Sequence, residues 1–177
     1  MSRFYLIIIL IISFSCSQKE VDERILKFKN TLGQRETIAL DKLVSDFEKN
    51  LEKNYPNLTI ENRYKKYLND IISVSSGNTE KFKFQSNETN SEFHRSGLWK
   101  ETYERDSIYG LEINLTGKYM KAIYSIKDSD AFISRYYKKR EATGMLPIDL
   151  FIKGVLNSKS DFNDYFHKRI VVIEFSF

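Results

Sequence analysis

Cysteine, glycine and histidine are scarce in this sequence of 177 residues, and each scarcity excludes a class of protein. Cysteine occurs once, at Cys16, so no disulfide can form within the chain. The seven glycines are widely spaced and form neither a glycine-rich phosphate loop nor a Gly-x-Ser-x-Gly elbow. His94 and His167 form no His-Glu-x-x-His arrangement, and there is no second cysteine. We therefore predict no metal site and no cofactor.

Long apolar runs are also rare, and the most apolar one lies at the start of the sequence. Arg3 precedes the run "FYLIIILII" at residues 4–12, and the small residues Ser13 and Ser15 follow it. A positive start, an apolar run and small residues are the three parts of a secretory signal. Nine apolar residues are too few for a permanent membrane helix, which needs about 20. We predict a signal peptide over residues 1–15.

The single cysteine directly follows this signal, in the stretch "ISFSCSQKE" at residues 12–20. The order of charged start, apolar run, small residue and cysteine resembles the lipobox of bacterial lipoproteins. The resemblance implies that Cys16 becomes the new N-terminus and carries acyl groups such as palmitate on its sulfur and its amine. Ser17 after the cysteine implies sorting to the outer membrane. The charged leader of residues 18–23 resembles the surface-export signal of Bacteroidota lipoproteins.

Ordinary secretory cleavage remains open, because Ser13 and Ser15 also satisfy the small-x-small rule. That cleavage would leave Cys16 as a free thiol, which is a liability in an oxidising compartment. We therefore favour acylation and predict a lipidated tether at residues 16–23, followed by a single domain at 24–177.

No sign of charge dominates the sequence. The formal net charge is +4, and basic and acidic residues are interleaved along both halves. A nucleic-acid-binding protein is expected to gather its basic residues on one face. We exclude nucleic acid as a partner and expect a membrane, and in addition an envelope protein or a glycan.

Helical spacing of apolar residues predicts a mainly α-helical domain. Four amphipathic helices are expected: Val21–Leu32, Leu40–Leu51, Ile60–Ile72 and Ile148–Leu156. Gly33, Pro56 and Gly77 would end the first three, Thr59 would cap the third, and Pro147 suits the first turn of the fourth. Between Tyr119 and Tyr137, paired apolar residues predict two helices broken near Asp128, with Asp128 or Ser129 as the cap of the second.

Alternating apolar residues predict a small β element beside these helices. Short strands are expected near residues 81–85, 109–115 and 170–177. Residues 73–91 are otherwise polar and rich in asparagine and serine, so we predict a loop there.

Two stretches combine aromatic and charged residues in the manner of contact surfaces. The first, "SGLWKETYERDSIYG", makes Trp99, Tyr103 and Arg105 candidate partner contacts. We favour the alternative in which Trp99 and Tyr103, four residues apart, form the buried face of a helix. The second, "SRYYKKRE" at residues 134–141, suits an anionic glycan or a lipid headgroup. Here too we favour an ordinary helix with its tyrosines inward and its cations near the C-terminal end.

These features predict a lipid-anchored envelope protein that acts as a non-enzymatic binding or accessory protein. A different hypothesis is a cell-wall or glycan hydrolase that uses scattered carboxylates, such as Asp161 with Asp164 or Glu101 with Glu104. A third is a protective partner that blocks an envelope toxin. An enzyme predicts a pocket lined by acids or a histidine, whereas a binding module predicts exposed apolar surface, for example around Trp99.

Overall fold

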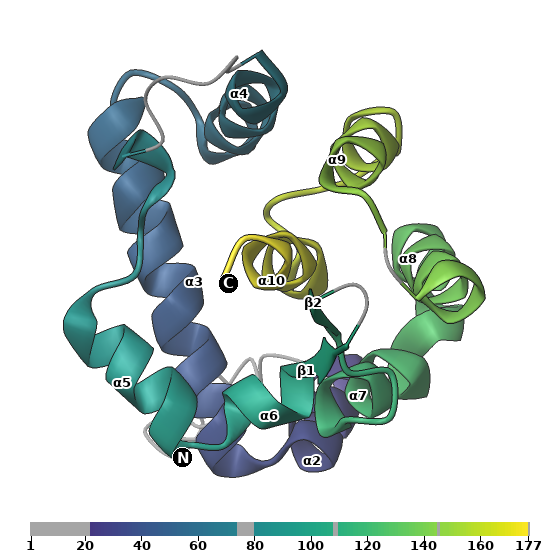
Figure 1. Ribbon diagram of the computed structural model, residues 1–177. Helices are drawn as coiled ribbons and strands as arrows, with labels where there is room; N and C mark the ends of the chain where they lie inside the picture. Colours follow the sequence, from purple (N-terminus) through teal and green to yellow (C-terminus); the bar gives the residue numbers. More distant parts are fainter. Residues whose placement is uncertain (1–21, 74–79, 108–109, 145, 177) are drawn as a thin grey trace, which may run out of the picture.

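The computed structural model describes residues 22–73, 80–107, 110–144 and 146–176. This part of the chain is mainly helical and holds one two-stranded antiparallel sheet, which confirms the predicted fold class. Helix α10 (Tyr165–Glu174) lies at the centre, and the other helices are arranged around it (Figure 1). None of the described helices is both long and apolar enough to cross a bilayer.

The first three described helices lie where the apolar spacing predicts them. They are α2 (Glu23–Leu32), α3 (Gln34–Asn54) and α4 (Ile60–Ser73). Gly33 separates α2 from α3 with a φ of 108°, a backbone conformation that favours glycine. Helix α3 ends at Asn54, and its C-cap residue Tyr55 directly precedes Pro56. Thr59 Oγ1 accepts a hydrogen bond from the backbone N–H of Asn62 at 3.4 Å, and the predicted stop at Gly77 lies outside the described residues.

The strand predicted at residues 81–85 is wrong. Glu80–Phe82 form a 3₁₀ turn, η1, and the stretch predicted as a loop contains α5 (Asn87–Arg95). Phe82 packs edge-on against Tyr67, and Phe84 packs against Phe47, with ring centroids 5.4 Å and 5.0 Å apart. Their alternation therefore serves core packing instead of strand pairing.

One of the three predicted strands is confirmed, and its partner is one that the sequence pattern does not reveal. Strand β2 (Gly110–Ile113) lies within the predicted 109–115 and pairs with β1 (Tyr103–Asp106), so that Tyr103 is opposite Ile113. The short helix α6 (Leu98–Thr102) precedes β1. Trp99 and Tyr103 therefore do not share a helix face, because the helix ends between them.

Two helices separated near Asp128 are confirmed, but the predicted cap is wrong. Helix α7 (Lys118–Ile126) is followed by the 3₁₀ turn η2 (Lys127–Ser129) and by α8 (Ala131–Thr143). Asp130 caps α8, because its carboxylate accepts hydrogen bonds from the backbone N–H groups of Phe132 and Ile133 at 2.7 and 3.0 Å.

Helix α9 (Ile148–Leu156) begins directly after Pro147, as predicted. The strand predicted at 170–177 is wrong, because α10 continues to Glu174. Four consecutive residues of α10, from Ile170 to Ile173, are fully buried. A helix that is buried on all sides shows no amphipathic period, and its β-branched residues then imitate a strand in the sequence.

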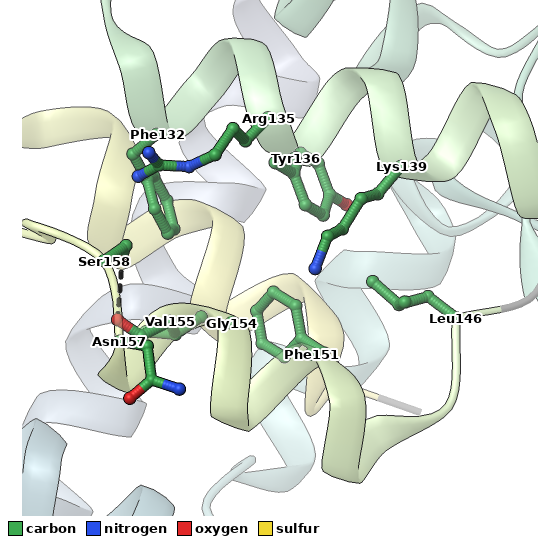
Figure 2. A pocket seen from close by; sticks show the side chains of 10 residues that line it. All are labelled: Phe132, Arg135, Tyr136, Lys139, Leu146, Phe151, Gly154, Val155, Asn157 and Ser158. Atoms are coloured by element: carbon green, nitrogen blue, oxygen red, sulfur yellow. Dashed lines mark hydrogen bonds between the residues drawn. The ribbon is translucent and has the colours of Figure 1, made fainter.

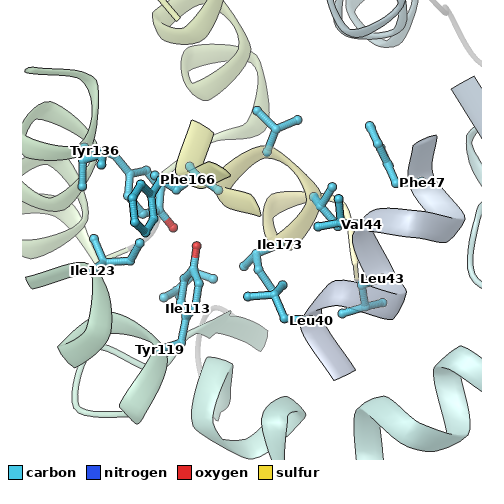
Figure 3. Close-up of a cluster of buried hydrophobic side chains, with 14 of the residues drawn as sticks. Leu40, Leu43, Val44, Phe47, Ile113, Tyr119, Ile123, Tyr136, Phe166 and Ile173 are labelled. Atoms are coloured by element: carbon cyan, nitrogen blue, oxygen red, sulfur yellow. The ribbon is translucent and has the colours of Figure 1, made fainter. Parts of the chain in front are cut away.

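The hydrophobic core lies between α10 and the helices around it. Helix α3 contributes Leu40, Leu43, Val44 and Phe47, and they face Ile173 of α10 across the core (Figure 3). Tyr64 of α4 stacks on Phe162 in the connection before α10, with ring planes 7° apart. Packing against α10 thus fixes the positions of α3 and α8, whereas α4 packs on Phe162 and Phe175 at the two ends of α10.

Candidate ligand-binding site

A pocket of about 250 Å³ lies between α8 and α9 (Figure 2). Its lining consists of three aromatic, two cationic, two aliphatic and three small or polar residues: Phe132, Arg135, Tyr136, Lys139, Leu146, Phe151, Gly154, Val155, Asn157 and Ser158. Phe132, Tyr136, Phe151 and Val155 are buried and form the apolar floor. Arg135 and Lys139 are exposed at the rim.

The helical repeat explains why these residues meet. Phe132, Arg135, Tyr136 and Lys139 recur at steps of three, one and three, which places all four on one face of α8. Phe151, Gly154 and Val155 repeat the same spacing on α9. Two helix faces of matching period therefore enclose the pocket, and neither helix forms it alone.

The rim of the pocket carries two unpaired positive charges. In the described part of the chain no carboxylate forms an ion pair with Arg135 or Lys139, whereas Lys153 nearby lies 3.4 Å from Asp149. Arg135 extends over the end of the pocket at Phe132, and Lys139 reaches towards α9 (Figure 2). The site thus combines an apolar floor with two cations that are free to bind an anion.

Gly154 allows Lys139 to approach α9 closely. A Cβ atom added at Gly154 would lie 3.3 Å from Lys139 Nζ, and apart from the neighbouring residues and backbone of α9 no other heavy atom lies within 4 Å of that position. The absence of a side chain therefore leaves room for the ammonium group beside α9.

A second hollow of about 400 Å³ continues the pocket along α9. It shares Lys139, Leu146, Gly154 and Asn157 with the first and extends over Leu150 and Lys153. Leu150 is 49% exposed, and Leu146 is half-buried. The two hollows form one groove, called here the α8–α9 groove, with apolar side chains at its open end.

A buried ion pair holds the floor of the groove in place. Arg140 and Glu174 are paired and nearly inaccessible to solvent, and the Tyr136 hydroxyl donates to Glu174 Oε1 at 2.7 Å. Burial raises the pKa of the Glu174 carboxyl above its ordinary value, although Arg140 acts in the opposite direction. Burial and the nearby Glu174 also raise the pKa of the Tyr136 hydroxyl, so this tyrosine remains a proton donor.

The candidate contacts predicted around Trp99 differ in exposure, although the rings of Trp99 and Tyr103 lie near each other, with centroids 6.1 Å apart. Trp99 is half-buried on α6 and stacks on His94, with ring centroids 5.5 Å apart. Tyr103 is buried, and its hydroxyl donates to the backbone oxygen of Ile173. Arg105 is exposed on β1. Cys16, the predicted lipid attachment site, lies outside the described residues.

The histidines occupy unrelated positions. His94 is exposed, whereas His167 is buried at the start of α10. The backbone N–H of Asp161 donates to His167 Nδ1 at 2.9 Å, so Nε2 carries the proton and faces Asp130 Oδ1 at 3.1 Å. Across the described ranges, no three histidine, cysteine or acidic side chains are grouped so as to hold a metal ion.

Three of the four carboxylates considered for hydrolysis accept hydrogen bonds from the backbone. Asp164 caps α10 by accepting from the N–H of Phe166 at 2.7 Å, and Asp161 accepts from the N–H of Asn163 at 2.8 Å. Glu101 accepts from the N–H of Lys118 at 2.8 Å, whereas Glu104 is exposed on β1. Neither pair lines a hollow described above.

The sequence reveals one wall of the groove but not the other. Residues 134–141 stand out as basic and tyrosine-rich, and Tyr136 points inward, as the helix interpretation predicts. Phe151 and Gly154 are not recognisable as site residues, because only the packing of α9 against α8 brings them there. Comparisons of the chain with protein-family models, with curated proteins and with solved structures find no match.

Proposed function

We propose that the protein is a lipid-anchored component of the cell envelope that binds an anionic ligand in the α8–α9 groove without transforming it. The observation that carries this proposal is the pair of exposed cations, Arg135 and Lys139, which lack an acidic partner among the described residues and stand over an apolar floor. Unpaired cations beside buried aromatic rings suit a ligand with an anionic group and a small apolar part.

The size and donors of the pocket limit the ligand further. Pockets that bind drug-sized ligands usually have volumes of about 300 Å³ or more. This pocket, of about 250 Å³, is smaller, so only a small chemical group enters it fully. The Arg135 guanidinium suits bidentate binding of a carboxylate or phosphate, and the Lys139 ammonium adds a second charge. A charge-assisted hydrogen bond contributes about 1.5–3 kcal/mol.

The lining supports binding more than catalysis. Its described residues include no carboxylate and no histidine, and the Ser158 hydroxyl donates to the backbone oxygen of Val155 at 2.7 Å. Glu112 and Glu174 line another hollow, of about 210 Å³, and are the best carboxylates for the hydrolase hypothesis. Arg140 and Tyr136 already engage Glu174, which leaves it poorly placed to act on a substrate.

The proposed location on a membrane depends on the predicted signal peptide and on the single cysteine of the sequence. Acylation at Cys16 would hold the mature protein on a membrane, which we propose to be the outer membrane, because several acyl chains give lasting attachment. The measurement is the intact mass of protein purified from a lipoprotein-competent host, beside a Cys16→Ala variant. A wild-type mass equal to residues 16–177 plus acyl groups, absent in the variant, supports the anchor. An unmodified thiol at Cys16 would contradict it.

A titration with small ligands tests the groove itself. Glycerol phosphate is added to the isotope-labelled protein, with glycerol as the uncharged control, and backbone NMR shifts are followed at Gly154. The double variant Arg135→Gln/Lys139→Gln should lose the response. The matched variant Lys53→Gln/Lys100→Gln removes the same charge from exposed positions on α3 and α6 that form no ion pair with a described residue, and it should retain the response. Equal responses in both variants would refute the site.

A further inference from the structure

The α8–α9 groove contains apolar side chains that soluble anions alone do not explain. Leu150 is large, 49% exposed and lines the hollow that contains Lys139 and Lys153, and the half-buried Leu146 lines the same hollow. A single exposed apolar residue is ordinary, but an exposed leucine at the mouth of a cationic groove, next to a second leucine, gives that face an amphipathic character.

We propose that this face docks on an anionic phospholipid membrane, with a lipid headgroup in the α8–α9 groove and with Leu150 in the apolar layer beside it. The proposal rests on the proposed function, because it names the anionic ligand of the same groove. It identifies the ligand as part of a membrane and the groove as a membrane contact.

Charge complementarity supports this partner. Arg135, Lys138 and Lys139 of α8 are exposed and form no ion pair with a described residue. Asp149, an acid at the same surface, is matched by Lys153 at 3.4 Å, so the face is positive overall. Each lysine or arginine near an anionic bilayer strengthens binding about fivefold.

The point where the tether joins the domain also supports this orientation. The guanidinium of Arg24, in the first turn of α2, lies 3.6 Å from the carboxylate of Asp164. His167 links Asp164 to Asp130, because its Nε2 lies 4.0 Å from the first carboxylate and 3.1 Å from the second. Asp130 caps α8, and the pocket residue Phe132 packs on His167 with ring centroids 4.5 Å apart. The chain therefore enters the domain beside the end of the groove formed by Phe132.

The length of the tether keeps that end near the bilayer. Six residue steps separate Cys16 from Asp22. An extended chain spans at most about 3.6 Å per residue, so an acylated Cys16 would hold the start of the domain within about 22 Å of the membrane surface. Docking then becomes an intramolecular step with a high effective concentration of lipid.

A fluorescent label at Leu150 tests the docked face in the full lipidated protein. Cys16 is the only cysteine, so acylation leaves Leu150→Cys as the one free thiol, which is labelled with a polarity-sensitive dye. Ile38→Cys is the matched control, because Ile38 on α3 is 50% exposed and lines none of the hollows described above. Both proteins are reconstituted in vesicles of phosphatidylcholine alone and in vesicles that also contain phosphatidylglycerol.

The proposal expects an apolar shift of the Leu150 label in the anionic vesicles alone, and no shift of the Ile38 label. Adding Arg135→Gln/Lys139→Gln should weaken docking about 30-fold, because each of the two lost charges contributes about fivefold. Adding Lys53→Gln/Lys100→Gln should leave the shift of the Leu150 label unchanged. An equal shift in neutral vesicles, or a shift that survives loss of the groove cations, overturns the headgroup assignment.

The glycerol phosphate titration separates this inference from the function on which it rests. If the groove binds glycerol phosphate through Arg135 and Lys139 but the Leu150 label does not respond to anionic vesicles, membrane docking is refuted and the binding function stands. If the groove does not bind glycerol phosphate and the Leu150 label does not respond to anionic vesicles, both the binding function and the membrane docking are refuted.

Discussion

Gly154→Ala should make the protein more stable and at the same time a weaker binder. Gly154 lies inside α9, where replacing glycine by alanine stabilises a helix by about 0.5–1 kcal/mol. The new methyl group meets only Lys139 Nζ, at 3.3 Å, and this end of a flexible side chain can move away. For a domain of this size the gain corresponds to a melting temperature about 1–4 °C higher.

The same methyl group lies where the ammonium of Lys139 approaches α9. Displacing that ammonium removes one charge-assisted contact, worth about 1.5–3 kcal/mol, so affinity for glycerol phosphate should fall about tenfold or more. Thermal unfolding followed by circular dichroism measures the first effect, and the NMR titration measures the second.

A stabilised control shows whether the loss of binding is specific. Asn90→Ala replaces an exposed asparagine inside α5, remote from the groove, and should also raise stability, by up to about 0.7 kcal/mol. Its affinity should equal that of the wild type. If Gly154→Ala binds glycerol phosphate as tightly as Asn90→Ala does, the ligand does not occupy the floor beside Gly154, and the reasoning is refuted.

Three further predictions concern the stability of the fold. Arg140→Met leaves Glu174 buried without its partner and should lower the free energy of unfolding by about 3–5 kcal/mol in urea denaturation. Adding Glu174→Leu to this variant should restore most of the lost stability. Equal losses in the single and the double variant would contradict the pairing. Phe47→Ala opens a cavity in a fully buried site and should cost about 3–5 kcal/mol in the same assay, and a loss under 1 kcal/mol would contradict its place in the core. Burial opposes a low pKa at Asp70, but hydrogen bonds from Lys66, Lys81 and Tyr55 lower it below 3.8. The unfolded state then binds more protons in acid, so stability should fall as the pH drops below about 3.8, and Asp70→Asn should flatten that decline in acid titrations of unfolding.

Apolar periodicity predicts those helices that are buried on one side only. Helices α2, α3, α4 and α9 each bury a stripe of side chains against the core, and that stripe is visible in the sequence. Helix α5 buries little more than Thr89 and Phe93, so a polar sequence conceals it. Helix α10 shows no amphipathic pattern for the opposite reason, because nearly all its positions are buried.

The candidate site shows the same limit at the level of single residues. The cations of α8 can be recognised because they cluster in the sequence. That Arg140 turns inward to Glu174 while Lys139 stays at the surface depends on where α10 lies. The position of Gly154 opposite Lys139 likewise follows from helix packing, which no local pattern encodes.

The central place of α10 has a consequence for the order of folding. The helices around α10 precede it in the chain, and their apolar faces cover it only once residues 165–174 have been synthesised. Until then, α3 and α8 lack the surface on which they pack, so the core cannot close before α10 is available. In an exported chain, as proposed here, this arrangement delays folding, because the earlier helices remain without their shared packing surface until residues 165–174 have been added.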